Sequence, residues 1–394
     1  MMDSYNQLKS ELNSELKNIL NYWCNNTLDN EYGGFFGRID HFNKVIPKAS
    51  KGIILNTRIL WSFSAASNHF KTNEYKDICD RSFQYLKTYF NDETYKGVYW
   101  ELDYLGEPKN KRKQVYAQAF AIYALSEYFK YSKNQEAKNW AIELFEQLEN
   151  HAKDNEKVGY FEAFDSQWGA IKDKRLSEKD MNASKTMNTH LHLLEAYTSL
   201  LSIYENNKVR SSLKELIVIF LGKFLNAQNH YDLFFDEDWK KLSNTVSYGH
   251  DIETAWLLIE AAKKVGDKEL LKQTEISAIN IANTFLNEAI DIDGAIMNEK
   301  NLNTGVLDTD RHWWPQVEAL IGLNYAYKLK NDPKFIDHSL KIWEFIKKYF
   351  IDSKNGEWFF RVDKNGKVYT EEDKVSMWKA PYHVTRACIK LINS

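Results

Sequence analysis

Two kinds of helical segment alternate along the chain. The first kind carries charged residues on one face, as in residues 75–83 (Tyr-Lys-Asp-Ile-Cys-Asp-Arg-Ser-Phe). The second kind is more apolar and richer in Ala and aromatic residues, which is typical of helices buried on all sides. The pattern therefore predicts pairs of helices, in which one member is partly exposed and the other is buried.

Short glycine-plus-aromatic stretches separate the two members of each pair and recur at nearly constant spacing. The markers of these stretches are Gly34, Gly97, Gly159, Asp232, Gly294 and Gly356, at intervals of 63, 62, 73, 62 and 62 residues. A fixed period is the signature of repeated structural units. Each marker is predicted to be a tight turn that enters a short strand.

Six helix–hairpin–helix units follow from this period. The predicted polar helices span 5–28, 74–90, 134–152, 209–227, 267–288 and 334–351, and the apolar helices span 52–69, 115–131, 186–205, 249–264, 314–330 and 380–392. With the polar helices outside and the apolar helices inside, the units predict an all-α fold. This fold is an (α/α)6 barrel with short β-hairpin loops at one end, and we expect residues 1–394 to form it as a single domain. Closure buries both ends of the array, whereas an open helical solenoid, the alternative, would have to cap them.

Composition and charge narrow the function classes. The chain has 394 residues, 43% hydrophobic and 14% aromatic, and a net charge of −3 with both signs interspersed, which argues against nucleic-acid binding. No apolar run approaches the length of a membrane span, and the first 20 residues are polar, so we expect no membrane association and no secretion. Cys24, Cys79 and Cys388 form no metal-binding pattern and suit a reducing compartment. We therefore expect a cytoplasmic monomer, with a homodimer as the alternative.

Candidate functional residues cluster at the N-terminal ends of the predicted inner helices. These ends carry unsatisfied N–H groups and partial positive charge, and in a closed barrel they point to one mouth. The candidates, in chain order, are Arg58, Tyr116, Asn188, His192, His250, Glu253, Trp313, Trp314, Glu318, Trp378 and His383. A lone helical histidine is more often structural, but His192, His250 and His383 occupy equivalent places in the repeat.

These residue types are suited to acid–base chemistry on a sugar. Glu253 follows His250 by three residues and shares its helix face, so its carboxylate is predicted to bond one ring nitrogen and leave the other to transfer a proton. Arg58 is suited to stabilising an oxyanion. Aromatic rings such as Trp313, Trp314 and Trp378 can stack on the apolar faces of pyranoses. Glu318 is a candidate for substrate binding or for pairing with another inner residue.

The pattern favours proton transfer at a carbon next to a carbonyl. Asp is scarce at the inner positions, whereas a glycoside hydrolase needs two carboxylates that face each other across the cleft. The sequence contains no His-Glu-x-x-His, no Cys cluster and no Gly-rich phosphate loop, so we expect no metal and no nucleotide cofactor. Two histidines of ordinary pKa near 6.5, on opposite faces of the carbon, would invert it. On this interpretation the rate falls below about pH 6 as a required histidine becomes charged.

Four segments resemble a known family. They are residues 185–192 (Lys-Thr-Met-Asn-Thr-His-Leu-His), 247–253 (Ser-Tyr-Gly-His-Asp-Ile-Glu), 312–316 (His-Trp-Trp-Pro-Gln) and 378–383 (Trp-Lys-Ala-Pro-Tyr-His). In order and spacing they closely resemble the cellobiose 2-epimerases of the N-acylglucosamine 2-epimerase superfamily. The similarity extends over nearly the whole chain, from Gly33 to the last helix.

The resemblance implies an (α/α)6 barrel and cofactor-independent epimerisation at C2 of the reducing-end sugar of β-1,4-linked disaccharides such as cellobiose and lactose. It implies that His250 and His383 are the acid/base residues and that His192 assists ring opening. Arg58 and Asn188 would hold the enediolate oxygens. Glu253 would support His250, and the sugar would be positioned by Tyr116, Trp314 and Trp378.

Three alternatives stay open. A mannose 2-epimerase or mannose–fructose isomerase would use the same bases on a monosaccharide. A glycoside hydrolase with the same barrel would cleave the disaccharide. A non-catalytic sugar-binding toroid would bind the sugar without turnover.

Overall fold

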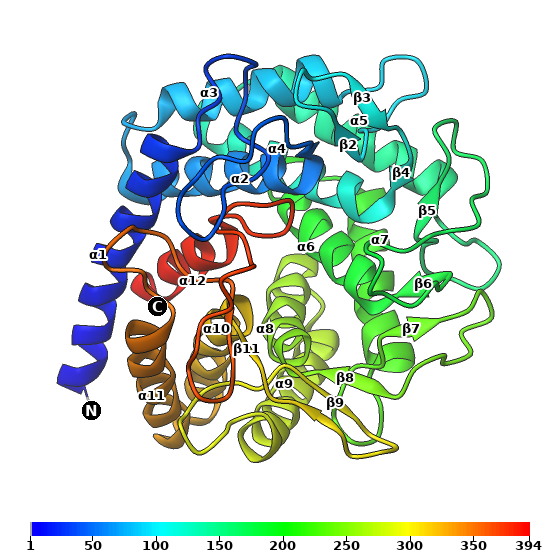
Figure 1. Ribbon diagram of the computed structural model, residues 1–394. Helices are drawn as coiled ribbons and strands as arrows, with labels where there is room; N and C mark the ends of the chain where they lie inside the picture. The colour runs from blue at the N-terminus through cyan, green and yellow to red at the C-terminus, as the bar shows by residue number, and fades with distance from the viewer. Residues whose placement is uncertain (1) are drawn as a thin grey trace.

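A computed structural model describes residues 2–394 of the chain, and this part contains twelve α-helices arranged in a ring (Figure 1). The outer helices are α1 (Met2–Asn26), α3 (Lys76–Tyr85), α5 (Gln135–His151), α7 (Asn207–Ile219), α9 (Lys268–Glu288) and α11 (Lys334–Tyr349). The inner helices are α2 (Ile53–Phe70), α4 (Val115–Ser132), α6 (Met187–Ile203), α8 (Tyr248–Val265), α10 (Trp313–Lys330) and α12 (Tyr382–Ile392). Short π-helical turns at Leu86–Phe90 and Phe220–Phe224 extend α3 and α7. The predicted (α/α)6 barrel is confirmed.

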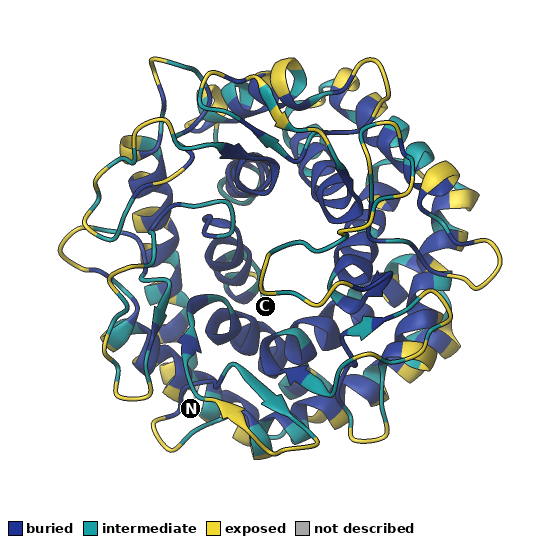
Figure 2. Ribbon diagram, turned by 45° about the vertical axis from the view of Figure 1, so that its right-hand side comes forward, coloured by how far each residue is buried: buried dark blue, intermediate teal, exposed yellow. Residues whose placement is uncertain are grey.

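The two kinds of helix bury different fractions of their surface, as the sequence pattern predicted. In Figure 2 the inner ring is buried along most of its length, whereas the outer helices expose their outward faces. Helix α4 buries every residue from Val115 to Ser126. Helix α11 buries one stripe that includes Phe335, Ile342 and Ile346, at the spacing of an amphipathic helix. The core of the protein therefore lies between the two rings.

Twelve short strands in residues 2–394 link the units at the N-terminal ends of the inner helices. They are β1 (Lys51–Gly52), β2 (Glu101–Leu102), β3 (Pro108–Asn110), β4 (Lys113–Gln114), β5 (Ala163–Phe164), β6 (Lys185–Thr186), β7 (Phe234–Phe235), β8 (Thr245–Ser247), β9 (Glu299–Asn301), β10 (Leu307–Asp308), β11 (Arg311–His312) and β12 (Arg361–Val362). The strand that precedes an inner helix pairs antiparallel with a strand of the next unit, as β1–β2, β4–β5, β6–β7, β8–β9 and β11–β12. A bridge between Ile39 and Val375 joins the sixth unit to the first and completes the circle.

The marker segments differ from the prediction in one respect. Each enters a single β-bridge rather than a strand, for example Asn91 with Val98 and Ile290 with Ile296. The turns themselves are as predicted, since Gly97 and Gly294 have φ of +80° and +84°. Glycine adopts such angles without steric cost, whereas other residues rarely do.

Buried ion pairs hold several of these turns against the start of the next inner helix. Lysine Nζ atoms lie 2.6–2.7 Å from aspartate oxygens in the pairs Lys51–Asp29, Lys113–Asp92, Lys185–Asp154 and Lys374–Asp352. In each pair the lysine precedes an inner helix and the aspartate lies in the marker turn. Removing one partner would leave an uncompensated buried charge, which is strongly unfavourable. The pairs therefore anchor the ends of the inner helices that carry the candidate site.

Within residues 2–394, every helix is too short or too polar to span a lipid bilayer.

Candidate active site

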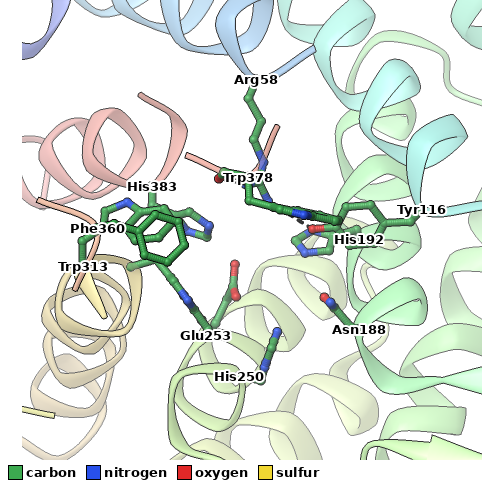
Figure 3. Close-up of a pocket in the computed structure, with 11 residues that line it drawn as sticks. Arg58, Tyr116, Asn188, His192, His250, Glu253, Trp313, Phe360, Trp378 and His383 are labelled. Atoms are coloured by element: carbon green, nitrogen blue, oxygen red, sulfur yellow. Dashed lines mark hydrogen bonds between the residues drawn. The ribbon is translucent and has the colours of Figure 1, made fainter. Parts of the chain in front are cut away.

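A cavity of about 190 Å³ lies at the N-terminal ends of the inner helices. Side chains from all six inner helices line it, together with Phe360 and Trp378 from the loops (Figure 3). Ten of the eleven residues predicted from the sequence line this cavity, and Glu318 is the exception. The structure therefore brings together candidates that are distributed from residue 58 to residue 383.

Helical register explains the convergence. The sixth residues of five inner helices are Arg58, Phe120, His192, Glu253 and Glu318. Because the inner helices surround one axis and enter from the same end, equivalent positions face the same interior. A second group lies nearer the mouth, at the second or third residue of its helix, and consists of Tyr116, Asn188, His250, Trp314 and His383.

The fourth residue of four inner helices binds a neighbouring hairpin and does not face the cavity. Gln118, His190, Asp251 and Gln316 each accept a hydrogen bond from a backbone N–H of the hairpin beside them. The donors are, in the same order, Val98 (2.7 Å), Tyr160 (2.9 Å), Tyr231 (2.8 Å) and Ile296 (2.9 Å). His190 and Asp251 are thus structural, although each lies close in sequence to a candidate histidine.

His383 is held from behind by Glu318. Its Nδ1 lies 2.8 Å from Glu318 Oε1, and the Glu318 side chain is fully buried. A carboxylate accepts hydrogen bonds, so Nδ1 carries the proton and Nε2 keeps the lone pair. Of the two roles considered for Glu318, the structure matches pairing with inner residues, because its carboxylate points to His383 and to Arg386 and does not line the cavity.

His250 has a different partner from the one predicted. Its Nδ1 lies 2.8 Å from Ser247 Oγ. Ser247 is the N-cap residue of α8 and makes no cap bond, so its hydroxyl is available to the ring. Glu253 accepts instead from Arg386, and the predicted pair between His250 and Glu253 is wrong. Spacing of three residues puts both side chains on one face, but a buried guanidinium is the stronger partner for a carboxylate.

His192 repeats the arrangement of His383. Its Nδ1 lies 3.1 Å from Glu195 Oε2, one turn further along α6. The rings of Tyr116 and Phe120 lie against the imidazole, with centroids at 4.8 and 4.6 Å. The carboxylate again indicates a proton on Nδ1 and a free lone pair on Nε2.

The Trp314 ring lies close to both candidate bases. Its ring centroid is 4.7 Å from that of His250 and 5.5 Å from that of His383. Gly249 makes this packing possible, because a Cβ at that position would lie 2.5 Å from the Trp314 ring. The two histidines, 133 positions apart in the chain, therefore line one cavity and both lie close to the same indole (Figure 3 labels both histidines).

Polar groups for substrate oxygens come from Arg58 and Asn188. Arg58 is buried and donates to the Trp378 carbonyl (3.0 Å) and to the Tyr116 hydroxyl (3.1 Å). Its guanidinium also lies over the Phe120 ring at 4.6 Å. Asn188 Oδ1 is buried and has no hydrogen-bond partner among residues 2–394, so it is free to accept from a bound hydroxyl.

Burial lowers the pKa of all three histidines. The pKa of His250 falls to about 4, with burial as the cause. Burial lowers the pKa of His192, although the neighbouring carboxylate of Glu195 acts to raise it. Burial lowers the pKa of His383 well below its ordinary value, although the charge of Glu253 acts to raise it. All three pKa values therefore lie below the ordinary value near 6.5, which favours the neutral imidazole at pH 7; His192 and His383 are buried, whereas His250 is half-buried.

One group of side chains has the spacing of a metal site. Ligand-type atoms of Glu253, Glu318 and His383 lie within 4.8 Å of one another. The guanidinium of Arg386 is bonded to both carboxylates, so an internal cation already supplies the positive charge between them. The structure thus indicates an ion-pair cluster rather than a metal centre.

Sequence reasoning assigned no role to three residues of the site. Phe360 lines the cavity and ends the sixth glycine-plus-aromatic segment, so its aromatic type was the available signal. Glu195 is a single charged residue in an otherwise apolar stretch of α6. Arg386 lies one turn after His383 on α12. A charged residue within a buried stretch of an inner helix was the signal for both.

Comparison with known proteins agrees with the geometry. The profile of the N-acylglucosamine 2-epimerase (GlcNAc 2-epimerase) family matches residues 34–387. A cellobiose 2-epimerase from Bacteroides fragilis is 44% identical over 387 residues, which are 98% of each chain. A cellobiose 2-epimerase structure from Bacillus thermoamylovorans has a TM-score of 0.93 at 37% identity, and covers 98% of this chain and 99% of that one.

Other similar proteins have lower sequence identity to this chain. A D-mannose isomerase from Marinomonas mediterranea is 24% identical over 98% of this chain and 97% of its own. A family 76 α-mannanase from Bacteroides thetaiotaomicron has a TM-score of 0.66 at 10% identity, and shares the fold alone. The family profile and the relatives over 30% identical cover almost all of the chain, which therefore belongs to the N-acylglucosamine 2-epimerase family.

Proposed function

We propose that this protein epimerises the reducing-end sugar of β-1,4-linked disaccharides at C2, converting cellobiose to glucosyl-mannose and lactose to epilactose. The observation that carries the proposal is the placement of His250 and His383 on one cavity, with both rings close to the indole of Trp314. The 44% identity to a cellobiose 2-epimerase, against 24% to a D-mannose isomerase, favours a disaccharide over free mannose.

The reaction begins with ring opening, which exposes the C1 carbonyl. His192 lies on the cavity with an unpaired Nε2 and is our candidate for the proton transfer that opens the ring. One of the pair His250 and His383 then takes the C2 proton and leaves an enediolate. Arg58 and Asn188 face the cavity and are our candidates for holding its oxygens, the electrostatic effect that usually contributes most to catalysis.

Inversion requires the second histidine to deliver a proton to the opposite face of C2. This neutral imidazole therefore first takes up a proton from solvent and returns to the neutral form when it gives that proton to C2, while the first histidine releases the abstracted proton to solvent. A single base that returned the proton to the same face would leave the sugar unchanged. Aromatic rings at the cavity wall are suited to stacking on the pyranoses and holding C2 between the histidines; they are Tyr116, Trp313, Trp314, Phe360 and Trp378. Glu253 also lines the cavity, where its carboxylate can accept from a sugar hydroxyl.

We also propose that the protein acts in the cytoplasm. Its three cysteines are free, and burial raises the pKa of the Cys79 thiol to about 12, so this thiol stays protonated and unreactive. Free cysteines suit a reducing compartment.

The test is incubation with cellobiose in D₂O, followed by NMR of the reducing-end sugar. We expect mannose-type signals with deuterium at C2, because the proton held by a histidine exchanges with solvent. Retention of the original C2 proton, or cleavage of the glycosidic bond, would overturn the proposal. Conversion of free mannose to a ketose, with cellobiose left unchanged, would instead identify a mannose isomerase.

Variants assign the chemistry to the two histidines. His250→Ala and His383→Ala are each expected to lower kcat by about 10²–10⁴-fold, the usual contribution of a general acid or base. The control is His151→Ala, at the exposed end of α5, which should keep the wild-type rate. Wild-type kcat in either cavity variant would remove that histidine from the mechanism.

A further inference from the structure

The floor beneath the cavity is built around one arginine. Arg386 of α12 is 1% exposed, and its guanidinium donates to carboxylates from three other inner helices. These are Glu195 of α6, Glu253 of α8 and Glu318 of α10, the last at 2.6 Å. The Tyr382 hydroxyl accepts from the same guanidinium and donates to Glu195 at 2.6 Å.

Each of these carboxylates is connected to the cavity. Glu195 bonds Nδ1 of His192, and Glu318 bonds Nδ1 of His383. Glu253 lines the cavity itself. Arg386 does not line it, so any effect of this arginine on substrate passes through the residues that it holds.

Three carboxylates this close together in a water-poor interior could not all stay ionised without a cation. Burial raises the pKa of Glu195, but Arg386 and His192 outweigh burial and bring it down to about 2. Burial raises the pKa of Glu318, and Arg386 opposes that rise. A protonated Glu318 would donate to His383 instead of accepting, and would move the ring proton to Nε2, where it would block a base.

Other charged or titratable groups also face this cluster. They are Arg58 on α2, Tyr116 and Tyr123 on α4, His192 on α6, and Tyr382 and His383 on α12. Among them, Arg58 is the only further permanent cation, and it belongs to the cavity wall. Arg386 is therefore the cation directly bonded to all three carboxylates.

We propose that Arg386 is a positioning residue, which keeps Glu195 and Glu318 as ionised acceptors and so holds His192 and His383 with Nδ1 protonated and Nε2 free toward the cavity. The proposed role in the reaction rests on the epimerase function given above. The effect on the ring nitrogens does not depend on it and is measured separately.

A second cavity, on the side of Arg386 away from the candidate active site, gives access to this arginine. It has a volume of about 640 Å³ and lies at the C-terminal ends of the inner helices. Trp61, Glu195, Trp256 and Arg386 contribute to its lining, so Glu195 and Arg386 form part of the partition between the two cavities. Removal of the arginine side chain would open a space that a small guanidinium can enter from the second cavity.

The first experiment measures histidine tautomers in protein labelled with ¹⁵N-histidine, by long-range ¹H–¹⁵N NMR at pH 7. In the wild type we expect His192 and His383 to carry the proton on Nδ1, with assignments made by His→Gln variants. In Arg386→Ala, His192, His383 or both should no longer carry the proton on Nδ1. In Arg386→Lys, which keeps the charge, both histidines should still carry it there. Arg210→Ala, on the outer helix α7, is the control and should match the wild type. An unchanged pattern in folded Arg386→Ala would overturn the proposal.

The second experiment measures kcat and KM on cellobiose. Arg386→Ala should lower kcat by about 10–100-fold, the cost of losing a group that orients a histidine from behind, while KM changes little. Loss of the cation raises the pKa of the neighbouring carboxyls and imidazoles, so the acid limb of kcat should move up by about one pH unit or more. Added methylguanidine should restore the activity of Arg386→Ala, and the restored activity should saturate with its concentration. Ammonium at equal ionic strength should not restore it.

The outcomes separate the two proposals. A wild-type protein that leaves cellobiose unchanged refutes the epimerase function, whereas the tautomer measurement still decides the role of Arg386. An active wild type with an equally active Arg386→Ala variant and an unmoved acid limb refutes the positioning role. Near-UV circular dichroism of each variant establishes that its tertiary packing is intact.

Discussion

His250 and His383 are the same residue type on the same cavity, yet their environments differ. His383 has a carboxylate behind it, which sets its tautomer, whereas His250 has a hydroxyl that can donate or accept. His383 is buried and His250 is half-buried at the cavity, and burial lowers both pKa values. The two candidate bases are therefore neutral at pH 7 for the same reason, but only His383 has its protonated nitrogen fixed by charge.

The low pKa of these histidines predicts the acid limb of the reaction. A base must be neutral to accept a proton, so activity falls only when pH approaches the pKa in the folded protein. For His250 this pKa is about 4, which places the midpoint of the acid limb of kcat/KM at about pH 4–5, below the pH 6 expected from an ordinary imidazole. The measurement is kcat/KM on cellobiose from pH 3.5 to 8, with circular dichroism at each pH to show that the protein stays folded. A midpoint at 6.5 would show that the bases are not shielded.

At the scale of elements, the fourth residue of an inner helix anchors the hairpin of its own unit. Gln316 is an example, because its amide accepts from the N–H of Ile296 (2.9 Å) and donates to the carbonyl of the same residue (2.9 Å). Ile296 is fully buried, so these backbone groups have no access to water. The cavity-facing residues and the hairpin-anchoring residues thus share one short helical end, on different faces.

Gln316→Ala is expected to destabilise the protein by about 1–3 kcal/mol, because a buried N–H and C=O lose their partners. Urea unfolding followed by circular dichroism measures the change. Gln273→Ala, at an exposed position on α9, is the matched control and should stay within about 0.5 kcal/mol of the wild type. Equal stability of the two variants would show that water replaces the lost bonds.

At the scale of the whole molecule, the ring closes where the first outer helix meets the last unit. Trp23 Nε1 donates to Glu357 at 2.5 Å, and Trp358 Nε1 donates to Glu15 at 2.6 Å. Both indoles are fully buried, so each donor needs its carboxylate. These two bonds cross from the N-terminal helix to the sixth unit.

Trp23→Ala is expected to cost about 3–5 kcal/mol, the usual range for an aromatic side chain removed from a core. Phe42→Ala is the control, since Phe42 is 74% exposed and its loss should change stability by less than about 0.5 kcal/mol. Urea unfolding of both variants gives the comparison. A small effect of Trp23→Ala would show that the ring does not depend on this contact for its stability.

Periodicity along the chain was enough to predict the barrel, because amphipathic spacing and turn residues are local properties of the sequence. The segment predicted at 267–288 forms α9 (Lys268–Glu288), and the equivalent places of His192, His250 and His383 in the repeat are enough to bring them to one cavity. The hydrogen-bond partners of these residues could not be predicted from the periodicity. Helix spacing suggested Glu253 for His250, but α12 delivers Arg386 from 133 positions away and takes that carboxylate. In a buried site each charged group pairs with the strongest partner within reach, and only closure of the ring decides which partners are within reach.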